Sequence, residues 1–254
     1  MDELPVSPAE KREDYWSLAR QPLNCFVFLL PLLAAYELGV WMVSTGDGSR
    51  NGADYWMRGA LRLAGFEHPA LLPLLVIGLL AFRHVSGRFR WKLSPATLLG
   101  MCAESALFGV CLVVLGQLQD LAFHSHAPRA QRLAVPLSQP GMLPLVVSYL
   151  GAGVYEEVLF RVCLFKLGCG AFRVLLIPRQ AAVVLAVIVS SLLFSAAHYV
   201  GPAADDFTLF TFCFRAMAGV FFCVLFVWRG FGISVGSHAA YDLLVGILIP
   251  AMAI

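Results

Sequence analysis

Charged residues are scarce in this sequence, at 13% of its 254 residues against about 25% in an average globular protein. Hydrophobic residues supply 59% of the chain, and the mean hydropathy is +0.78. This balance excludes an ordinary water-soluble domain and predicts a polytopic membrane protein. The net charge of +2 is too small to indicate a nucleic-acid-binding surface, so no nucleic acid is expected as a partner.

Metal-binding and disulfide motifs are also lacking. The seven cysteines include no C-x-x-C pair, and the sequence contains no H-E-x-x-H. The cysteines are odd in number and lie mostly inside apolar runs, so they are predicted to be small core residues. No metal or other cofactor is expected. The first residues lack the basic start and early apolar core of a signal peptide, so the first span is expected to be retained as an anchor.

Long apolar runs predict the membrane spans, because about 20 apolar residues cross a bilayer as a helix. The expected fold is an all-α, polytopic membrane helical bundle of about seven to eight transmembrane helices. The seven predicted spans are 22–44, 69–83, 96–121, 140–167, 179–199, 207–228 and 231–250. The fourth is long and contains Pro144, Gly151 and Gly153, so it is expected to be broken or preceded by a separate helix near the surface. The segment 55–66 has arginines at helical spacing among apolar residues and is predicted to lie at the membrane surface.

Lysine and arginine are distributed unevenly between the predicted loops. With the N-terminus inside, eleven of them fall in inner segments and five in outer ones, which favours a cytoplasmic N-terminus. No linker or internal repeat divides the chain. We therefore expect residues 1–254 to form a single integral membrane domain, with residues 1–21 as a cytoplasmic N-terminal segment.

Three ionisable residues, Glu156, Glu157 and Arg161, interrupt the apolar run of the fourth span. Each costs about 2.5–3.5 kcal/mol inside a membrane on insertion scales, so all three should be paired or functional. Glu157 and Arg161 are four residues apart and are predicted to pair, whereas Glu156 is rotated by about 100° and should stay free. The plainer alternative is a structural ion pair that joins two spans.

Two later spans also carry polar residues at helical spacing. Phe194 and His198 are four residues apart at the end of the fifth span, and His238 and Asp242 are four apart inside the seventh. A lone histidine at a helix end is commonly a plain interfacial residue. A His and Asp pair on one face at membrane depth instead indicates a functional site.

Three more ionisable residues fall at membrane depth outside these motifs. They are Glu37, Glu104 and Arg215. The sequence assigns them no chemical role. Arg215 is expected to form a structural pair with Glu104 or Asp242.

Taken in chain order, the patterns E-E-x-x-x-R, F-x-x-x-H and H-x-x-x-D resemble the three motifs of a known family. It is the CPBP family of CAAX-type, glutamic intramembrane endopeptidases, which includes the Ras-converting enzyme and bacterial Abi proteins. The resemblance covers about residues 151–249, which are expected to form the catalytic core. It implies an integral membrane protein of the bacterial inner membrane.

The resemblance also implies a role for each motif residue. Glu156 and His198 would position and activate a water, and His238 with Asp242 would stabilise the oxyanion. The supporting residues would be Glu157, Arg161 and Phe194. Some members carry Asn where this chain has Asp242. An ionised Asp cannot donate a hydrogen bond, so Asp242 must be protonated or must only orient His238.

The expected function is hydrolysis of a peptide bond in a membrane-associated protein or peptide, within the lipid bilayer. A zinc-dependent membrane protease is the nearest alternative, because zinc accepts side chains of the types found at Glu156, His198, His238 and Asp242. A proton or ion transporter and a non-catalytic immunity or scaffold protein are alternatives of another class. Transporters commonly show repeated halves with broken helices, and no such symmetry is visible. The sequence indicates no oligomeric state.

Overall fold

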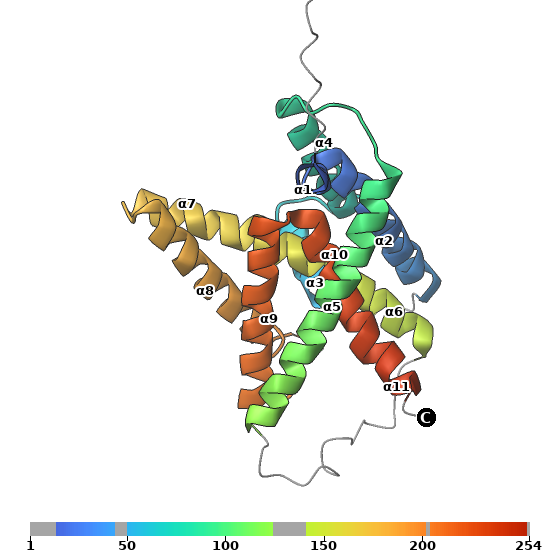
Figure 1. Cartoon of the computed structure of the whole chain (residues 1–254), viewed down its shortest axis with the longest axis vertical. Coiled ribbons are helices and arrows are strands. Elements are labelled where there is room, and N and C mark those ends of the chain that lie inside the picture. Colours follow the sequence, from blue (N-terminus) through green and yellow to red (C-terminus); the bar gives the residue numbers. More distant parts are fainter. Residues whose placement is uncertain (1–13, 44–49, 124–140, 202–203, 253–254) are drawn as a thin grey trace, which may run out of the picture.

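The computed structural model describes residues 14–43, 50–123, 141–201 and 204–252. Every regular element within these ranges is a helix, as Figure 1 shows, so the predicted all-α bundle is confirmed. Six helices are long and apolar enough to cross a membrane. They are α2 (Pro22–Val43), α5 (Pro95–Phe123), the continuous helix Met142–Val174, α8 (Arg179–Ala197), α9 (Leu209–Trp228) and the helix Phe231–Leu248.

The remaining helices are shorter. They are α1 (Tyr15–Ala19), α3 (Gly52–Leu63), α4 (Leu71–Ser86) and α11 (Ile249–Met252). The predicted span at 69–83 corresponds to α4, which is apolar but has only 16 residues. The chain is therefore a polytopic helical bundle with six long spans and one short apolar helix.

The fourth predicted span is not broken, but it widens. It consists of α6 (Met142–Gly151), two π-helical segments (Ala152–Glu156 and Val158–Phe165) and α7 (Lys166–Val174). A π-helix has i→i+5 hydrogen bonds, hence more residues per turn than an α-helix, and it occurs frequently at functional sites. The widened part carries the E-E-x-x-x-R motif. The predicted break is thus replaced by a local change of helical pitch, which keeps the backbone hydrogen-bonded at membrane depth.

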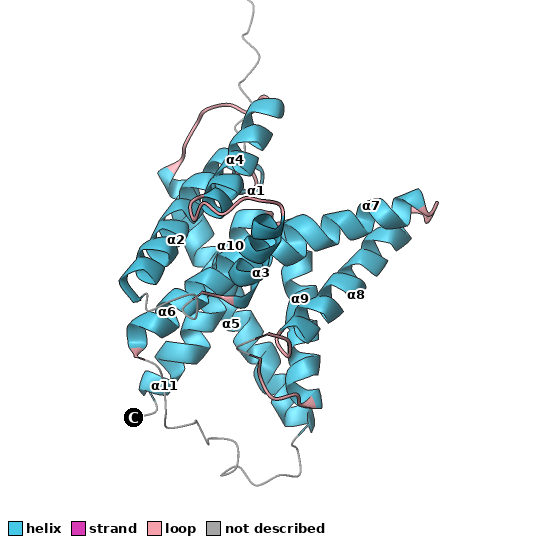
Figure 2. Ribbon diagram, turned by 180° about the vertical axis from the view of Figure 1, so that it is seen from behind, coloured by secondary structure: helices cyan, strands magenta, loops and turns pink. Residues whose placement is uncertain are grey.

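The centre of the bundle is α10 (Phe231–Leu243), which continues as a π-helical turn (Leu244–Leu248). It packs against α5, α2, α9 and the π-helical segment that ends at Glu156. The first nine residues of α10 are all buried. Small residues permit this close packing: a Cβ atom added at Gly153 would lie 2.8 Å from the Cβ of Ala239. In both views, α7 and α8 form a hairpin that projects from one side of the bundle (Figures 1 and 2).

The predicted surface helix at 55–66 is α3, which begins at Gly52 with Asn51 as its N-cap. Figure 2 shows it in front of the bundle, where it contacts the π-helical segment Ala152–Glu156. Its Arg58 is buried and pairs with Asp54 and Glu37. One face of α3 is therefore held by ion pairs against the spanning helices.

The expected pairing of Arg215 with Glu104 or Asp242 is wrong. Arg215 lies near the start of α9 and pairs with Asp205 in the preceding loop. Glu104 instead pairs with Arg229, just beyond the end of α9, and accepts a hydrogen bond of 2.5 Å from the hydroxyl of Tyr15. Burial, together with this carboxylate, raises the pKa of Tyr15 to about 12. The error arose because hydropathy gives the depth of a residue but not the neighbour its side chain faces.

Candidate active site

Residues from three separate helices meet around one carboxylate oxygen, Oε2 of Glu156. It lies 4.0 Å from Nε2 of His198 and 3.8 Å from Nε2 of His238. The same nitrogen of His238, Nε2, lies 3.6 Å from Oδ2 of Asp242. These separations are too long for direct hydrogen bonds but short enough for one small group to contact two of the atoms at once. The fold thus brings together the four residues predicted to be catalytic.

The orientation of His198 is fixed by its own helix. Its Nδ1 lies 2.8 Å from the carbonyl oxygen of Phe194, one turn earlier at the end of α8. A carbonyl oxygen can only accept, so Nδ1 carries a proton and the neutral ring keeps a lone pair on Nε2. The Phe194 ring also meets the imidazole at a steep angle, with centroids 5.0 Å apart. The four-residue spacing of this motif therefore directs a basic nitrogen towards Glu156.

The orientation of His238 is fixed by a different residue. Its Nδ1 lies 2.9 Å from Oε1 of Glu157, and its ring stacks on Phe222 with centroids 4.4 Å apart. The carboxylate accepts the Nδ1 proton, which leaves Nε2 facing Glu156 and Asp242. Neighbouring glutamates in one sequence motif thus contact opposite nitrogens of the same imidazole.

Glu157 is fully buried and surrounded by donors. It accepts a hydrogen bond of 2.5 Å from the hydroxyl of Ser234, and Nε of Arg161 lies 3.3 Å from the same oxygen. The Arg161 guanidinium stands 4.5 Å from the centroid of the Phe194 ring and donates to the carbonyl of Gly219. The pairing predicted from the spacing of Glu157 and Arg161 is present. It links all three motifs, since Arg161 also contacts the phenylalanine of the second.

Asn51 is a site residue that the sequence did not reveal. Its Nδ2 donates to Oε1 of Glu156 over 3.0 Å, while its Oδ1 caps α3 by accepting from the backbone N–H of Ala53. Among the described residues, Oε2 of Glu156 is buried and has no hydrogen-bond partner. One oxygen of the carboxylate is therefore held in place, and the other faces the two histidines.

A network of ion pairs holds α3 in position over Glu156. Tyr155 donates to Glu37 over 2.5 Å, and Arg58 pairs with both Glu37 and Asp54, at 2.9 Å and 2.6 Å. Arg50, next to Asn51, pairs with Asp54 at 2.8 Å. Glu37, to which the sequence assigns no role, thus joins the first span to α3, the helix that Asn51 caps.

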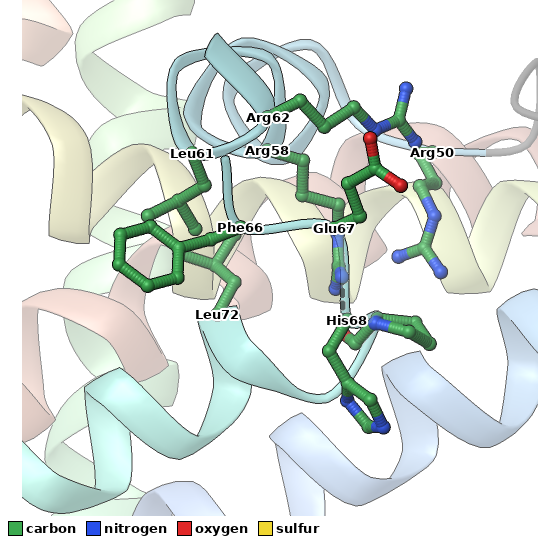
Figure 3. Close-up of a pocket in the computed structure, with 9 residues that line it drawn as sticks. Arg50, Arg58, Leu61, Arg62, Phe66, Glu67, His68 and Leu72 are labelled. Atoms are coloured by element: carbon green, nitrogen blue, oxygen red, sulfur yellow. Dashed lines mark hydrogen bonds between the residues drawn. The ribbon is translucent and has the colours of Figure 1, made fainter. Parts of the chain in front are cut away.

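A cavity of about 120 Å³ opens beside this network, as Figure 3 shows. Three arginines line it, namely Arg50, Arg58 and Arg62. Glu67 lies among these side chains in the figure, and Arg50 and Arg58 are already paired with Glu37 and Asp54. The cavity therefore has nearby carboxylates to balance its positive charges.

A family model named Rce1-like matches residues 138–244, and its description is type II CAAX prenyl endopeptidase Rce1-like. No curated protein and no solved structure matches the chain. The matched segment contains the three motifs whose side chains meet in the bundle, so the family resemblance predicted from them is confirmed. Over residues 138–244, this polytopic membrane protein is thus similar to CAAX-type intramembrane proteases of the Rce1-like family.

Proposed function

We propose that the chain is a glutamic-type intramembrane endopeptidase in which Glu156 is the general base. The observation that carries the proposal is the buried Oε2 of Glu156, which lacks a hydrogen-bond partner among the described residues and lies about equally far from two histidine nitrogens. A water between Glu156 and His198 meets two acceptors, a carboxylate oxygen and the Nε2 lone pair. Both protons of the water then form hydrogen bonds to these two acceptors, and the water oxygen is free to attack a peptide carbonyl.

His238 is proposed to stabilise the oxyanion. Its Nδ1 proton is held by Glu157, so protonation of the ring places the second proton on Nε2, facing the reaction centre. The buried carboxylate of Glu157 stabilises that imidazolium, as the carboxylate of a serine-protease triad does. A protonated Asp242 would add a second donor on the same side, 3.6 Å from Nε2. A buried, largely apolar site strengthens each of these interactions.

The proposed substrate is a membrane-associated protein or peptide, cleaved in the bilayer of the bacterial inner membrane. The cytoplasmic N-terminus expected from the charge count is part of this proposal. It places His198, at the end of the fifth predicted span, towards the outer leaflet. Labelling of a cysteine introduced at Ala204 from the outer side only would support this topology, and labelling from the cytoplasmic side only would invert it.

A zinc-dependent protease is a second candidate, because each of four side chains of ligand type lies within 4.0 Å of at least one of the others. In the described ranges, no group of three or more such residues is arranged to hold a metal ion. The test uses membranes of cells that lack the protein as the source of substrates. Purified protein reconstituted with them should shorten one or more small membrane proteins, detected by mass spectrometry, and a chelator should leave the cleavage unchanged.

Two outcomes of this experiment would contradict the proposal. Cleavage that is lost with the chelator and restored by zinc would establish the metalloprotease. A complete absence of mass changes, with protein of unchanged thermal stability, would favour a transport or scaffold role.

Asn51→Ser is expected to lower the cleavage rate about tenfold to a hundredfold while the cap of α3 is kept. Serine caps a helix about as well as asparagine, so α3 keeps its N-terminus. Its hydroxyl is too short to replace the amide that holds Oε1 of Glu156, and a hydrogen bond to a charged group contributes about 1.5–3 kcal/mol. Rate constants measured alongside melting temperatures check this.

A suitable control is Asn51→Ala, which removes both the cap and the amide. It should cost the same activity as Asn51→Ser and, in addition, about 1 kcal/mol of stability. Full activity in Asn51→Ser would show that Asn51 acts only as a helix cap.

A further inference from the structure

A second cavity, of about 230 Å³, lies at the N-terminal end of α10, away from the candidate active site. We call it the basic cavity, after Arg20, Arg83 and Lys166, which line it. The rest of its wall is mostly apolar and includes Cys25, Leu80, Phe226 and Phe231. Phe231 precedes His238 by seven residues, which corresponds to roughly 10 Å along a helix axis. The basic cavity is therefore separate from the residues proposed to act in hydrolysis.

The three basic side chains are solvent-exposed, and in the described part of the chain none of them pairs with a carboxylate. Arg20 donates to the backbone carbonyl of Val227, at the end of α9, and Nζ of Lys166 lies 5.5 Å from the centroid of the Phe226 ring. Arg83 and Lys166 line the same cavity. Three positive charges around one cavity, with no carboxylate among the described residues that line it, favour the binding of an anion.

Tryptophans indicate the depth of the basic cavity in the membrane. Trp16 and Trp228 pack together beside it, with ring centroids 5.7 Å apart, and about half of each side chain is exposed. Tryptophan is enriched at the boundary between the hydrocarbon core and the headgroups. The cavity also lies where α2 and α10 begin and α9 ends. These features place it at the level of the lipid headgroups, on the side that the charge count assigns to the cytoplasm.

We propose that the basic cavity binds the phosphate headgroup of an anionic phospholipid in the cytoplasmic leaflet. The phosphate would interact with Arg20, Arg83 and Lys166, and the glycerol and first acyl carbons would contact the apolar wall at Leu80 and Phe226. Basic pockets between spanning helices on the cytoplasmic side are a recognised way of binding such lipids. The proposal requires no catalysis, and only its assignment to the cytoplasmic leaflet rests on the topology given with the proposed function.

The test measures lipid binding by purified protein in a neutral detergent, from the rise in melting temperature during titration. Phosphatidylglycerol should stabilise the protein, whereas phosphatidylcholine, which has the same chains and no net charge, should not. Inorganic phosphate and glycerol 3-phosphate report whether an anion without chains is sufficient. Equal stabilisation by these soluble anions would overturn the proposal of a lipid.

The variant Arg83→Gln/Lys166→Gln should bind phosphatidylglycerol about 30-fold more weakly. Each basic residue near an anionic headgroup adds a comparable increment of binding free energy, so the losses from the two substitutions multiply in the affinity. Both side chains are exposed, so its melting temperature without lipid should match that of the unmodified protein. The matched control is Arg173→Gln/Arg179→Gln, which removes two exposed charges on the same side but outside the cavity. Equal loss of affinity in both double variants would mean general surface attraction and would refute a defined site.

Discussion

Glu156→Gln is expected to reduce peptide-bond cleavage by a factor of about 10²–10⁴, the range that a positioned general base contributes. Glutamine has the same shape, and its amide oxygen can still accept the hydrogen bond from Asn51, so the fold should be retained. It cannot take a proton from water. The measurement is the cleavage rate of a membrane-anchored substrate by reconstituted protein, with the melting temperature as the check on folding.

Asp242→Asn is the matched acid-to-amide control for this prediction. Asp242 faces the same histidine nitrogen as Glu156, at 3.6 Å instead of 3.8 Å. If Asp242 acts as a neutral donor, asparagine replaces it with a permanent donor of similar size, and substantial activity should remain. A loss of activity in Glu156→Gln alone would then be due to the missing base and not to a changed charge in the cluster.

Two results would contradict the assignment of Glu156. Full activity in Glu156→Gln would exclude it as the base. Equal and large losses in both variants would show that Asp242 must be ionised to orient His238. The loss in Glu156→Gln would then be explained by the changed net charge of the cluster and not by a missing base. The pH dependence of the remaining activity separates these cases, because a permanent amide donor removes any fall on the alkaline side that comes from ionisation of Asp242.

The sequence predicted the interactions that depend on spacing within one helix. Residues four apart share a face, so the Glu157 pair with Arg161 and the common direction of His238 and Asp242 followed from helical geometry alone. The scarcity of charge at membrane depth then identified these residues as a set. The site could be recognised because its three motifs each span a single helical turn.

Interactions between helices could not be predicted in the same way. Asn51 is 105 residues from Glu156 and lies in a loop, and its contact depends on the ion pairs that hold α3. Ser234 is one of many small residues in α10, and only the close packing of that helix brings its hydroxyl to Glu157. Which side chains meet across an interface is set by helix rotation and approach, and hydropathy reports neither.

Glu157→Gln is expected to lower the free energy of unfolding by about 3–5 kcal/mol, the usual cost of leaving one member of a buried ion pair uncompensated. Arg161 would keep its charge with its whole surface buried, and its Nε and Nη1 already lack hydrogen-bond partners among the described residues. Ser234→Ala is the control, because it removes the hydroxyl that donates to Glu157 and contacts the Phe222 carbonyl, and it leaves the ion pair in place. Ser234→Ala should lower the free energy of unfolding by clearly less than Glu157→Gln does. Reversible unfolding in mixed detergent micelles gives both values.

The double variant Glu157→Gln/Arg161→Met decides whether the loss comes from the unpaired charge. Methionine fills much of the space of the arginine stem and removes the charge that lies against the Phe194 and Phe222 rings, so part of the lost stability should return. Activity should not return with it, because a neutral glutamine at Nδ1 no longer stabilises the His238 imidazolium. Recovery of both stability and cleavage would mean that Glu157 serves the fold alone. Recovery of neither would show that the two residues do not act as a pair.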